Sequence, residues 1–551
     1  MSLPSFSTQA ELFSTAGLST SLFGPKDRYR IFAQTVFPVL AAVRGQLEKC
    51  YCADNGRVAV EPVLLLGVSL LQYLDGLPDR QAVEMLRYHA GWNFALNRQL
   101  GDELFHPTTL VNFRQRLLEH EQSALCFQAI LDALAEAELV SRQSRQRLDS
   151  TQMFGLVSRM SRLDCVRESL RLAMEELESS VGPEALPEFW VELWGRYVES
   201  QVDYRANSEA LGRKLVEAGT DTARLLKWAG EPAQKTLARG PQWALLERVF
   251  QEQFKVSEAP AQAVPKGKTE LESDRVRNPH DAEATYAAKG EGTKKKEHVG
   301  YKVQVAETVN QAELKPGEPT QNFITGIVTH AAYESDEAGA EKMEAEQAAM
   351  GMDKPPVQYV DGAYVSAQKL AEAEAEGRSL MGPAAAAPNN NGGRSTTEDF
   401  DVSVGELRAI CPAGKESTQC SRLEEQATGK VTYRFEWSTH CANCPLRERC
   451  VGREQKHRSI VVGEHHSALQ SRRREQKTKG FAQEMKHRNG IEGTQSELVR
   501  AHGIRRARYR GLAKARLQNY FAAAACNIKR WINRKLWDLS RASAATRLAV
   551  S

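Results

Sequence analysis

The sequence lacks the features of a membrane-bound or secreted protein. Its 551 residues contain no run of 18 or more apolar residues, so we expect no membrane-spanning helix. The opening stretch MSLPSFSTQAELFSTAGL has no basic region followed by an apolar one, which predicts no secretory signal and a cytoplasmic location. No internal repeat is visible. The 41% hydrophobic and 26% charged residues are ordinary for a globular protein of three or four domains, or of one catalytic core with insertions.

A strong excess of charge is also missing from the chain as a whole, but the charge is unevenly distributed. The net charge is only +3, whereas residues 453–535 carry 21 lysines and arginines against 6 aspartates and glutamates, a local charge of +15. A basic segment within a balanced chain favours a polyanionic partner, most often nucleic acid. A solvated helical face with counter-ions is the alternative interpretation of the same pattern.

Cysteine is scarce outside one segment, since five of the ten cysteines lie between residues 411 and 450. The motif CANCPLRERC places Cys441 and Cys444 on one tight turn, a spacing typical of structural zinc sites. We expect four of these thiols to bind a structural Zn²⁺: Cys411, Cys441, Cys444 and Cys450. Cys420 and His440 are reserve ligands. An iron–sulfur cluster would use a similar spacing, and buried free thiols are the alternative without a metal.

Hydrophobic periodicity predicts helices near both ends of the chain, over residues 1–140 and 467–537. Two of the N-terminal segments, residues 61–74 and 106–120, carry a proline in the first turn, where a helix tolerates it best. Short helices with tight turns are typical of a helix-turn-helix DNA reader, and a plain helical bundle fits the same pattern.

The middle of the chain alternates between strand and helix patterns. Runs of β-branched and aromatic residues predict four strands, at residues 145–153, 298–308, 322–331 and 355–366. A long helical stretch (160–255) and a loop rich in Pro, Gly and charge (256–297) separate the first two strands. A helix over residues 367–376 follows the last strand. This alternation predicts a mixed α/β core that carries insertions.

Two aspartates stand where predicted strands end. Asp149 in RLDST and Asp361 in YVDGAY follow apolar strand residues, so a sheet would hold both side chains facing a cleft. Phosphoryl transfer without a cofactor uses such carboxylates to hold two Mg²⁺ ions, and a third carboxylate completes the site. Glu492 is the candidate, because Arg488 shares its helical face and suits a neighbouring phosphate. Turn capping by the aspartates and a weak surface ion pair between Arg488 and Glu492 are the ordinary alternatives.

Three acidic motifs follow one another along the chain: LDST with Asp149, VDGAYVS with Asp361, and RNGIEGTQSELVRAHG with Glu492. Together with the N-terminal stretch LLLGVSLLQYLDGLPDRQAVEMLRYHAGWNFALN, they resemble the DDE transposases of bacterial insertion sequences, in the branch numbered eleven eighty-two. The resemblance implies an α/β fold. Its centre would be an RNase H-like mixed sheet core, with a helical N-terminal domain, a helical insertion and a cysteine-bearing β insertion.

The same resemblance implies a division of the chain into six segments. They are a helical N-terminal DNA-binding domain (1–140), the first strand of the core (141–160), a helical insertion and linker (161–297), the continued core (298–376), a cysteine-rich β insertion (377–466) and a C-terminal helical part with the basic tract (467–551).

For the function, the resemblance implies metal-dependent cutting at the terminal inverted repeats of a transposon, and joining of the freed 3′-OH to target DNA. Asp149, Asp361 and Glu492 would be the catalytic carboxylates and would hold two Mg²⁺ or Mn²⁺ ions. The expected partners are double-stranded DNA and further copies of this chain, as a homodimer or larger assembly at the bacterial nucleoid, with no membrane. The rival interpretations are a decayed copy that binds transposon ends without cutting, and a general nuclease of the same fold.

Basic residues around and after Glu492 are expected to contact DNA phosphates: Arg488, Arg500, Arg505, Arg506, Arg508, Arg510 and Lys514. The family's Tyr-Arg-Glu-Lys signature is matched by Arg488 and Glu492 only. Met485 stands at the tyrosine position and Val499 at the lysine position, where the neighbouring Arg500 offers a substitute. The motif VDGAYVS also lacks the lysine of the family's ADKGY. These departures indicate altered handling of DNA ends, or a decayed copy.

Overall fold

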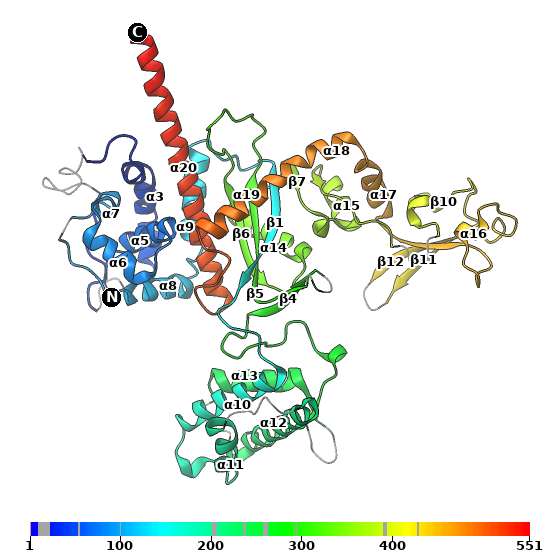
Figure 1. Ribbon diagram of the computed structural model, residues 1–551, viewed down its shortest axis with the longest axis horizontal. Helices are drawn as coiled ribbons and strands as arrows, with labels where there is room; N and C mark the ends of the chain where they lie inside the picture. The colour runs from blue at the N-terminus through cyan, green and yellow to red at the C-terminus, as the bar shows by residue number, and fades with distance from the viewer. Residues whose placement is uncertain are drawn as a thin grey trace.

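The computed structural model places a layer of short N-terminal helices beside a central sheet, and two further regions extend from this body (Figure 1). The structure describes residues 2–8, 22–52, 56–99, 101–200, 207–234, 239–256, 263–290, 293, 295–388, 394–426 and 429–550, and for residues 543–550 the backbone alone. None of the helices within these residues combines the length and the apolar character that crossing a membrane requires.

The N-terminal region is helical, as the sequence predicts. Its segments are α2 (Arg28–Ile31), η1 (Phe32–Val36), α3 (Phe37–Ala42), α4 (Arg44–Glu48), α5 (Pro62–Asp75), α6 (Asp79–Tyr88), α7 (Ala90–Ala95), α8 (Thr108–Glu119) and α9 (Leu125–Glu136). α5 begins at Pro62, where the Glu61 side chain accepts the backbone N–H of Val63. It ends at Gly76, whose φ of 68° is unfavourable for residues with a side chain.

Six strands form the central sheet: β1 (Gln146–Phe154), β4 (Thr285–Lys289), β5 (Lys296–Thr308), β6 (Ile324–Ala331), β7 (Val357–Tyr359) and β8 (Ser379–Met381). The strand order is β4-β5-β1-β7-β8, and β6 also pairs with β5. β5 is antiparallel to its neighbours, whereas β7 runs parallel to β1 and β8. Helices α14 (Asp336–Ala349) and α15 (Ala367–Ala375) provide the crossovers before and after β7.

β1 is paired along only part of its edge toward β7. β7 pairs with the first two residues of β1, so the strand from Asp149 onward leaves that edge open. The C-terminal part of the chain covers it: Phe154 exchanges two backbone hydrogen bonds of 2.8 Å with residues 505–507. The Gln495 side chain also donates to the carbonyl of Ser150 at 3.1 Å. Segments far apart in the sequence therefore meet along the edge of β1.

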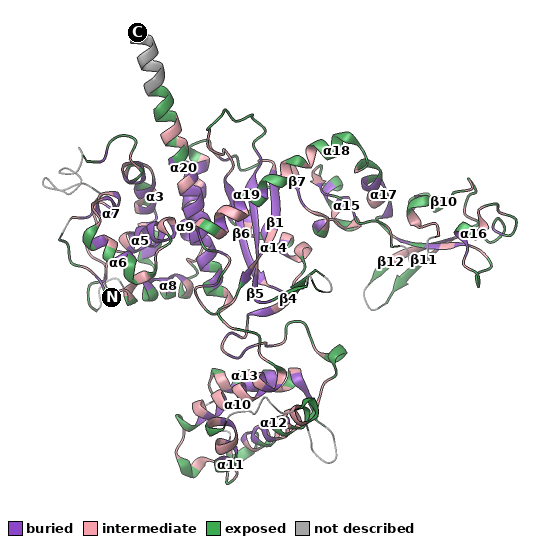
Figure 2. Cartoon of the chain, viewed as in Figure 1, coloured by how far each residue is buried: buried purple, intermediate pink, exposed green. Residues whose placement is uncertain are grey.

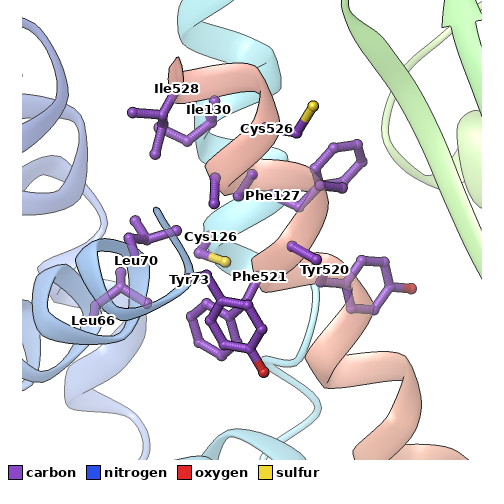
Figure 3. Close-up of a cluster of buried hydrophobic side chains, with 14 of the residues drawn as sticks. Leu66, Leu70, Tyr73, Cys126, Phe127, Ile130, Tyr520, Phe521, Cys526 and Ile528 are labelled. Carbon is purple, nitrogen blue, oxygen red and sulfur yellow. The ribbon is translucent and has the colours of Figure 1, made fainter. Parts of the chain in front are cut away.

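The longest helix, α20 (Leu512–Val550), joins the N-terminal helices to the sheet. Figure 3 shows its side chains packed against α5 and α9, with the ring of Tyr73 stacked on that of Phe521 at 5.7 Å between centroids. Residues 522–526, AAAAC, are fully buried, because small side chains let neighbouring elements approach closely. Figure 2 shows the inner part of α20 and the central strands buried, whereas the helix is exposed further out.

A second helical cluster follows β1 and has a hydrophobic core of its own. It contains α10 (Arg162–Glu178), η2 (Pro183–Ala185), α11 (Trp190–Trp194), η3 (Gly195–Glu199), α12 (Ser208–Ala229), η4 (Pro232–Gln234), α13 (Pro241–Gln253), β2 (Phe254–Val256), β3 (Ala263–Pro265) and η5 (Lys268–Glu270). Leu170, Leu225 and Leu246 are fully buried within it. α10 and α12 begin where Ser161 and Asn207 cap the first free backbone N–H groups.

The cysteine-bearing region follows β8 and packs around Phe400, Phe435 and Trp437, all of them buried. Its elements are η8 (Thr397–Asp399), β9 (Asp401–Ser403), β10 (Arg408–Ile410), β11 (Gln419–Glu425), β12 (Lys430–Glu436), α16 (Arg447–Cys450) and β13 (Ser459–Gly463). The chain then returns to the sheet through α17 (His466–Glu475), α18 (Lys479–Glu484) and α19 (Lys486–Ala501).

The structure corrects two predicted elements. The predicted loop 256–297 contains β3, β4 and the start of β5, because a five-residue edge strand gives little signal within a segment rich in Pro, Gly and Lys. The predicted strand 355–366 ends at Tyr359, after which Asp361 caps the short helical turn η7 (Gly362–Tyr364). The strands near 145–153, 298–308 and 322–331, and the helices within 160–255 and 467–537, are confirmed.

Candidate active site

β1 directs Asp149 toward α19. The Asp149 side chain is only 12% exposed, and its Oδ1 accepts the backbone N–H of Ser150 at 2.8 Å. Burial raises the pKa of this carboxyl, because the charged form loses water. Arg488 opposes the rise in pKa and the nearby Asp361 adds to it. The strand therefore holds a carboxylate whose charge is only partly compensated.

Asp361 reaches the same edge of the sheet from β7. β7 is parallel to β1, so the chain leaves both strands in the same direction and brings Asp361 near Asp149. The Asp361 side chain caps η7 by accepting the backbone N–H of Ala363 at 2.8 Å, and it remains 40% exposed. One oxygen thus fixes the turn while the carboxylate still faces solvent.

The guanidinium of Arg488 lies among all three predicted carboxylates. On α19, its Nη2 is 2.7 Å from Asp149 Oδ2 and 3.9 Å from Asp361 Oδ2. Its Nη1 is 3.1 Å from Oε1 of Glu492, which lies one helical turn later and is 68% exposed. The structure therefore brings together acidic residues from three distant segments, at a cation that the chain itself supplies.

α19 lies very close to β1, and a glycine permits this approach. A Cβ at Gly490 would overlap the guanidinium of Arg147, which lies two residues before Asp149 on β1. Arg147 Nη1 donates to the carbonyl of His487 at 2.9 Å, and this bond holds the first turn of α19. The positions of Arg488 and Asp149 are thus coupled through the contact beneath them.

Behind this contact lies a buried ionic network. Glu307 on β5 is fully buried, lies opposite Arg147 in the strand register, and accepts its Nε at 2.6 Å. The Thr494 hydroxyl and Arg530 Nη1 also contact Glu307, at 2.7–2.8 Å and 3.0 Å. Arg530 pairs in turn with Glu497 at 2.9 Å. Sequence reasoning missed this network, although paired charges at inward positions of two apolar strands are a signal for it.

The three carboxylates suit divalent ions by their chemistry, since Mg²⁺ and Mn²⁺ prefer oxygen ligands. They are more widely spaced than the ligands of a single closed site. Among the described residues, only one group of three donors lies within 4.8 Å of one another, and the triad is not that group. The positively charged guanidinium of Arg488 lies between the carboxylates, where a metal ion would otherwise bind. Ions at these carboxylates therefore require Arg488 to withdraw.

The closely spaced group is Glu497, His502 and Cys526, at the base of α19 and α20. Glu497 already contacts the cations Lys529 and Arg530 at 2.9 Å each, which disfavours a further positive ion. His502 Nδ1 lies 3.1 Å from the carbonyl of Tyr73, and burial lowers the pKa of its ring. We assign this group to packing rather than to metal binding.

The four cysteines predicted to bind zinc line one pocket of the cysteine-bearing region, together with His440. The backbone N–H of Arg458 donates to Cys441 Sγ at 3.4 Å, a bond that suits a thiolate. Burial, followed by the neighbouring thiols, raises the pKa of Cys450. No three of the sulfurs lie within 4.8 Å of one another, within the residues that the structure describes. Thiols fit Zn²⁺ by their chemistry, and the zinc site stays a prediction.

The residues predicted to bind DNA divide into two groups. Exposed side chains are Arg500, Arg506, Arg510 and Lys514. Arg505 is half-buried and its Nη1 lies 3.5 Å from the carbonyl of Gln152, while Arg508 stacks over the ring of Tyr73 at 4.5 Å. The exposed residues are available to a large anion, whereas the Arg508 side chain connects the C-terminal segment to α5.

Comparison with known proteins identifies two parts of the chain. A family model for the transposase DDE domain matches residues 410–532, which include Glu492 and the predicted zinc ligands. A model for a transposase domain (DUF772) matches residues 20–116, the N-terminal helices. No curated protein and no solved structure matches the chain. The two matches, to residues 20–116 and 410–532, support a DDE transposase of the insertion-sequence type.

Proposed function

We propose that the chain cuts DNA at the ends of an insertion sequence and joins them to target DNA, at a site formed by Asp149, Asp361 and Glu492. The observation that carries this proposal is their convergence on the guanidinium of Arg488. Asp149 lies within β1 and not at its end as predicted, Asp361 follows β7, and Glu492 lies on α19, so folding alone gives no reason for these carboxylates to gather. Their mutual repulsion opposes such an arrangement, and the single positive charge of Arg488 offsets only part of it.

The topology around the site supports an RNase H-like core. β1 lies between the antiparallel β5 and the parallel β7, and α19 crosses the open edge of β1. In this interpretation α10–α13 and the cysteine-bearing region are insertions, which fits their separate hydrophobic clusters. The predicted boundaries between the six segments, and the branch numbered eleven eighty-two, belong to the same proposal.

The chain's own residues would act as follows. Two divalent ions held at the three carboxylates would activate water or a 3′-OH and would stabilise the leaving oxygen. Asp149 is the rigid member, fixed by β1 and by the N–H of Ser150. Asp361 is held through its cap on η7, and Glu492 extends from the exposed face of α19. Arg488, after it withdraws from the carboxylates, would contact the phosphate next to the bond that is cut.

The DNA would follow the basic surface that adjoins the site. Residues 453–535 carry a local charge of +15, and Arg500, Arg506, Arg510 and Lys514 are exposed. Binding should therefore weaken steeply with salt, by on the order of 10³-fold between about 50 and 200 mM. The N-terminal helices would read the terminal inverted repeats. The predicted Zn²⁺ at the four thiols would stabilise the cysteine-bearing region, and the predicted homodimer or larger assembly would bring two ends together.

Nicking of an oligonucleotide that carries the element's ends tests the proposal. In Mg²⁺ or Mn²⁺, the wild-type protein should nick it and Asp361→Asn should not, because a neutral amide holds divalent ions poorly. The matched control is Asp353→Asn, an exposed position shortly before β7. Within the described residues, its backbone N–H donates to the carbonyl of Arg142 and its side chain forms no hydrogen bond. Equal nicking by wild type and Asp361→Asn would remove the catalytic assignment. Binding of the ends without nicking by any variant would favour a decayed copy.

A further inference from the structure

A second basic site lies at the outer edge of the sheet, away from the carboxylates. There the ring of Tyr286 on β4 has two guanidinium groups close to it, with Arg159 Cζ at 5.1 Å and Arg277 Cζ at 4.8 Å from the ring centroid. Arg159 lies on the chain that leaves β1, and Arg277 on the chain that leads into β4. The backbone N–H of Met160 donates to the carbonyl of Arg277 at 3.3 Å, which joins the two segments.

The positive charge at this site is poorly compensated. Arg159 Nη1 lies 2.7 Å from Oε2 of Glu297, and Lys295 Nζ lies 2.8 Å from Oε1 of the same carboxylate. Within the described residues, no carboxylate forms an ion pair with Arg277, and its Nε is buried without a hydrogen-bond partner. Burial, followed by the charges of Arg275 and Arg159, lowers the pKa of Arg277 to about 10. A fold gains nothing from crowding two guanidinium groups around one ring unless an anion joins them.

We propose that Arg159 and Arg277 form a binding site for a phosphodiester of the DNA backbone. Guanidinium groups bind phosphate oxygens through two parallel hydrogen bonds, and stacking on an aromatic ring orients them for it. The site rests on DNA being the substrate, and it lies outside the basic C-terminal segment. The side chain of Arg159 is 54% exposed, so a phosphate has access to it.

The position of the site indicates which phosphate it binds. Within β1, the stretch from Asp149 to Phe154 covers about 17 Å at the usual rise of a strand. Arg159 follows five residues later, and Phe154 and Arg506 stand exposed at the end of β1 between the two sites. Phosphates of one DNA strand are about 3.4 Å apart along the helix axis, so we expect the contact about five nucleotides from the bond that is cut.

The dependence of DNA binding on salt tests the site. Fluorescence anisotropy with labelled end DNA, in Ca²⁺ to prevent cutting, gives the slope of log K against log salt concentration. The proposed site holds one phosphate, and each lost phosphate contact reduces the slope by about 0.9, so Arg159→Gln with Arg277→Gln should reduce it by about 0.9. The paired change Arg159→Lys with Arg277→Lys keeps the charge and should keep the slope. Arg213→Ala, 74% exposed on α12 and only 3.6 Å from Glu209, should leave the slope unchanged.

Two further experiments, with shortened DNA and with inorganic phosphate, test whether the change in slope comes from a DNA phosphate at this site. DNA cut back to about four base pairs from the scissile bond should bind wild type and the glutamine variant with equal slopes. An unchanged slope for the glutamine variant on long DNA overturns the proposal. A second result would also overturn it. If inorganic phosphate raises the melting temperature of wild type but not of the glutamine variant, and both proteins show the same slope on long DNA, the site holds a small anion and not DNA. Asp361→Asn should show the wild-type slope, so failure of the catalytic assignment leaves this test intact.

Discussion

Two clusters of carboxylates and arginines lie on either side of α19, and they differ in how completely their charges are satisfied. The inner network consists of Arg147, Glu307, Thr494, Glu497 and Arg530, and the outer cluster of Asp149, Asp361, Arg488 and Glu492. Glu307 is fully buried and receives hydrogen bonds from three donor groups, on Arg147, Thr494 and Arg530. In the outer cluster three carboxylates share one guanidinium, and the exposure of their side chains rises from 12% to 68%.

The comparison separates an ion network that holds the fold from one that is available for chemistry. The charges of the inner network are matched and mostly buried, so removing a carboxylate or an arginine leaves its buried partner unpaired. The outer cluster has an excess of negative charge next to solvent, which makes it a place for additional cations. Arg147 and Asp149 are two residues apart on β1, so the same strand serves both clusters.

The largest effect is expected from neutralising the inner network. Glu307→Gln leaves Arg147 and Arg530 without their shared carboxylate in a buried position, so we expect a loss of about 3–5 kcal/mol in the free energy of unfolding. Glu492→Gln removes a mostly exposed carboxylate and should leave stability within about 0.5 kcal/mol of wild type while nicking is lost. Denaturant titration followed by circular dichroism measures both. Similar stability losses in the two variants would contradict the division into inner and outer clusters.

A methyl group at the contact between the clusters should have the next largest effect. Gly490→Ala drives a Cβ into the guanidinium of Arg147, and we expect a stability loss of about 1–3 kcal/mol as α19 shifts. Gly493→Ala on the same helix meets no atom within 4 Å, and should be stabilising by about 0.5–1 kcal/mol. Thermal unfolding of the two variants measures this difference. A stable Gly490→Ala protein with normal nicking would show that the close approach of α19 is not required.

Removal of the cation in the outer cluster should strengthen binding of metal ions. Arg488→Ala frees Asp149 and Glu492 from a competing guanidinium, so we expect the affinity for Ca²⁺ to rise on the order of tenfold. Isothermal titration calorimetry measures this affinity without any turnover. Arg488→Lys keeps a charge in place and should bind Ca²⁺ much as the wild-type protein does. An affinity that stays the same or falls in Arg488→Ala would mean that the arginine does not compete with the ions.

The sequence located the outer cluster but not the inner network. Asp149, Asp361 and Glu492 stand in motifs that a resemblance can recognise, and β1 and β5 are long enough for their periodicity to predict them. The pairing of Arg147 with Glu307 depends on the register of two strands about 160 residues apart, which no local pattern determines.

The sequence also did not predict how closely α19 approaches β1, or the short edge strand β4. The need for glycine at position 490 depends on how near α19 lies to β1, and a helix in isolation tolerates many residues there. β4 forms because β5 offers it a partner, as the register of Tyr286 with Val299 shows. The proposed phosphate site depends on that unpredicted strand, so only the folded chain brings Arg159 and Arg277 together.

The smallest effect is expected from Asp149→Asn, and its sign distinguishes the two clusters most directly. Burial raises the pKa of Asp149, so the folded protein binds this proton more tightly than the unfolded chain does. The contribution of the group to stability is therefore greatest below the unfolded pKa and declines as the pH rises through the folded value. An asparagine stays neutral at every pH, and Asp149→Asn should equal or exceed wild type at pH 7 by no more than about 1 kcal/mol. Denaturant titrations across the acid range should show the two proteins converging as the pH falls. A clear loss of stability at pH 7 would place Asp149 with Glu307, as a residue whose charge the fold requires.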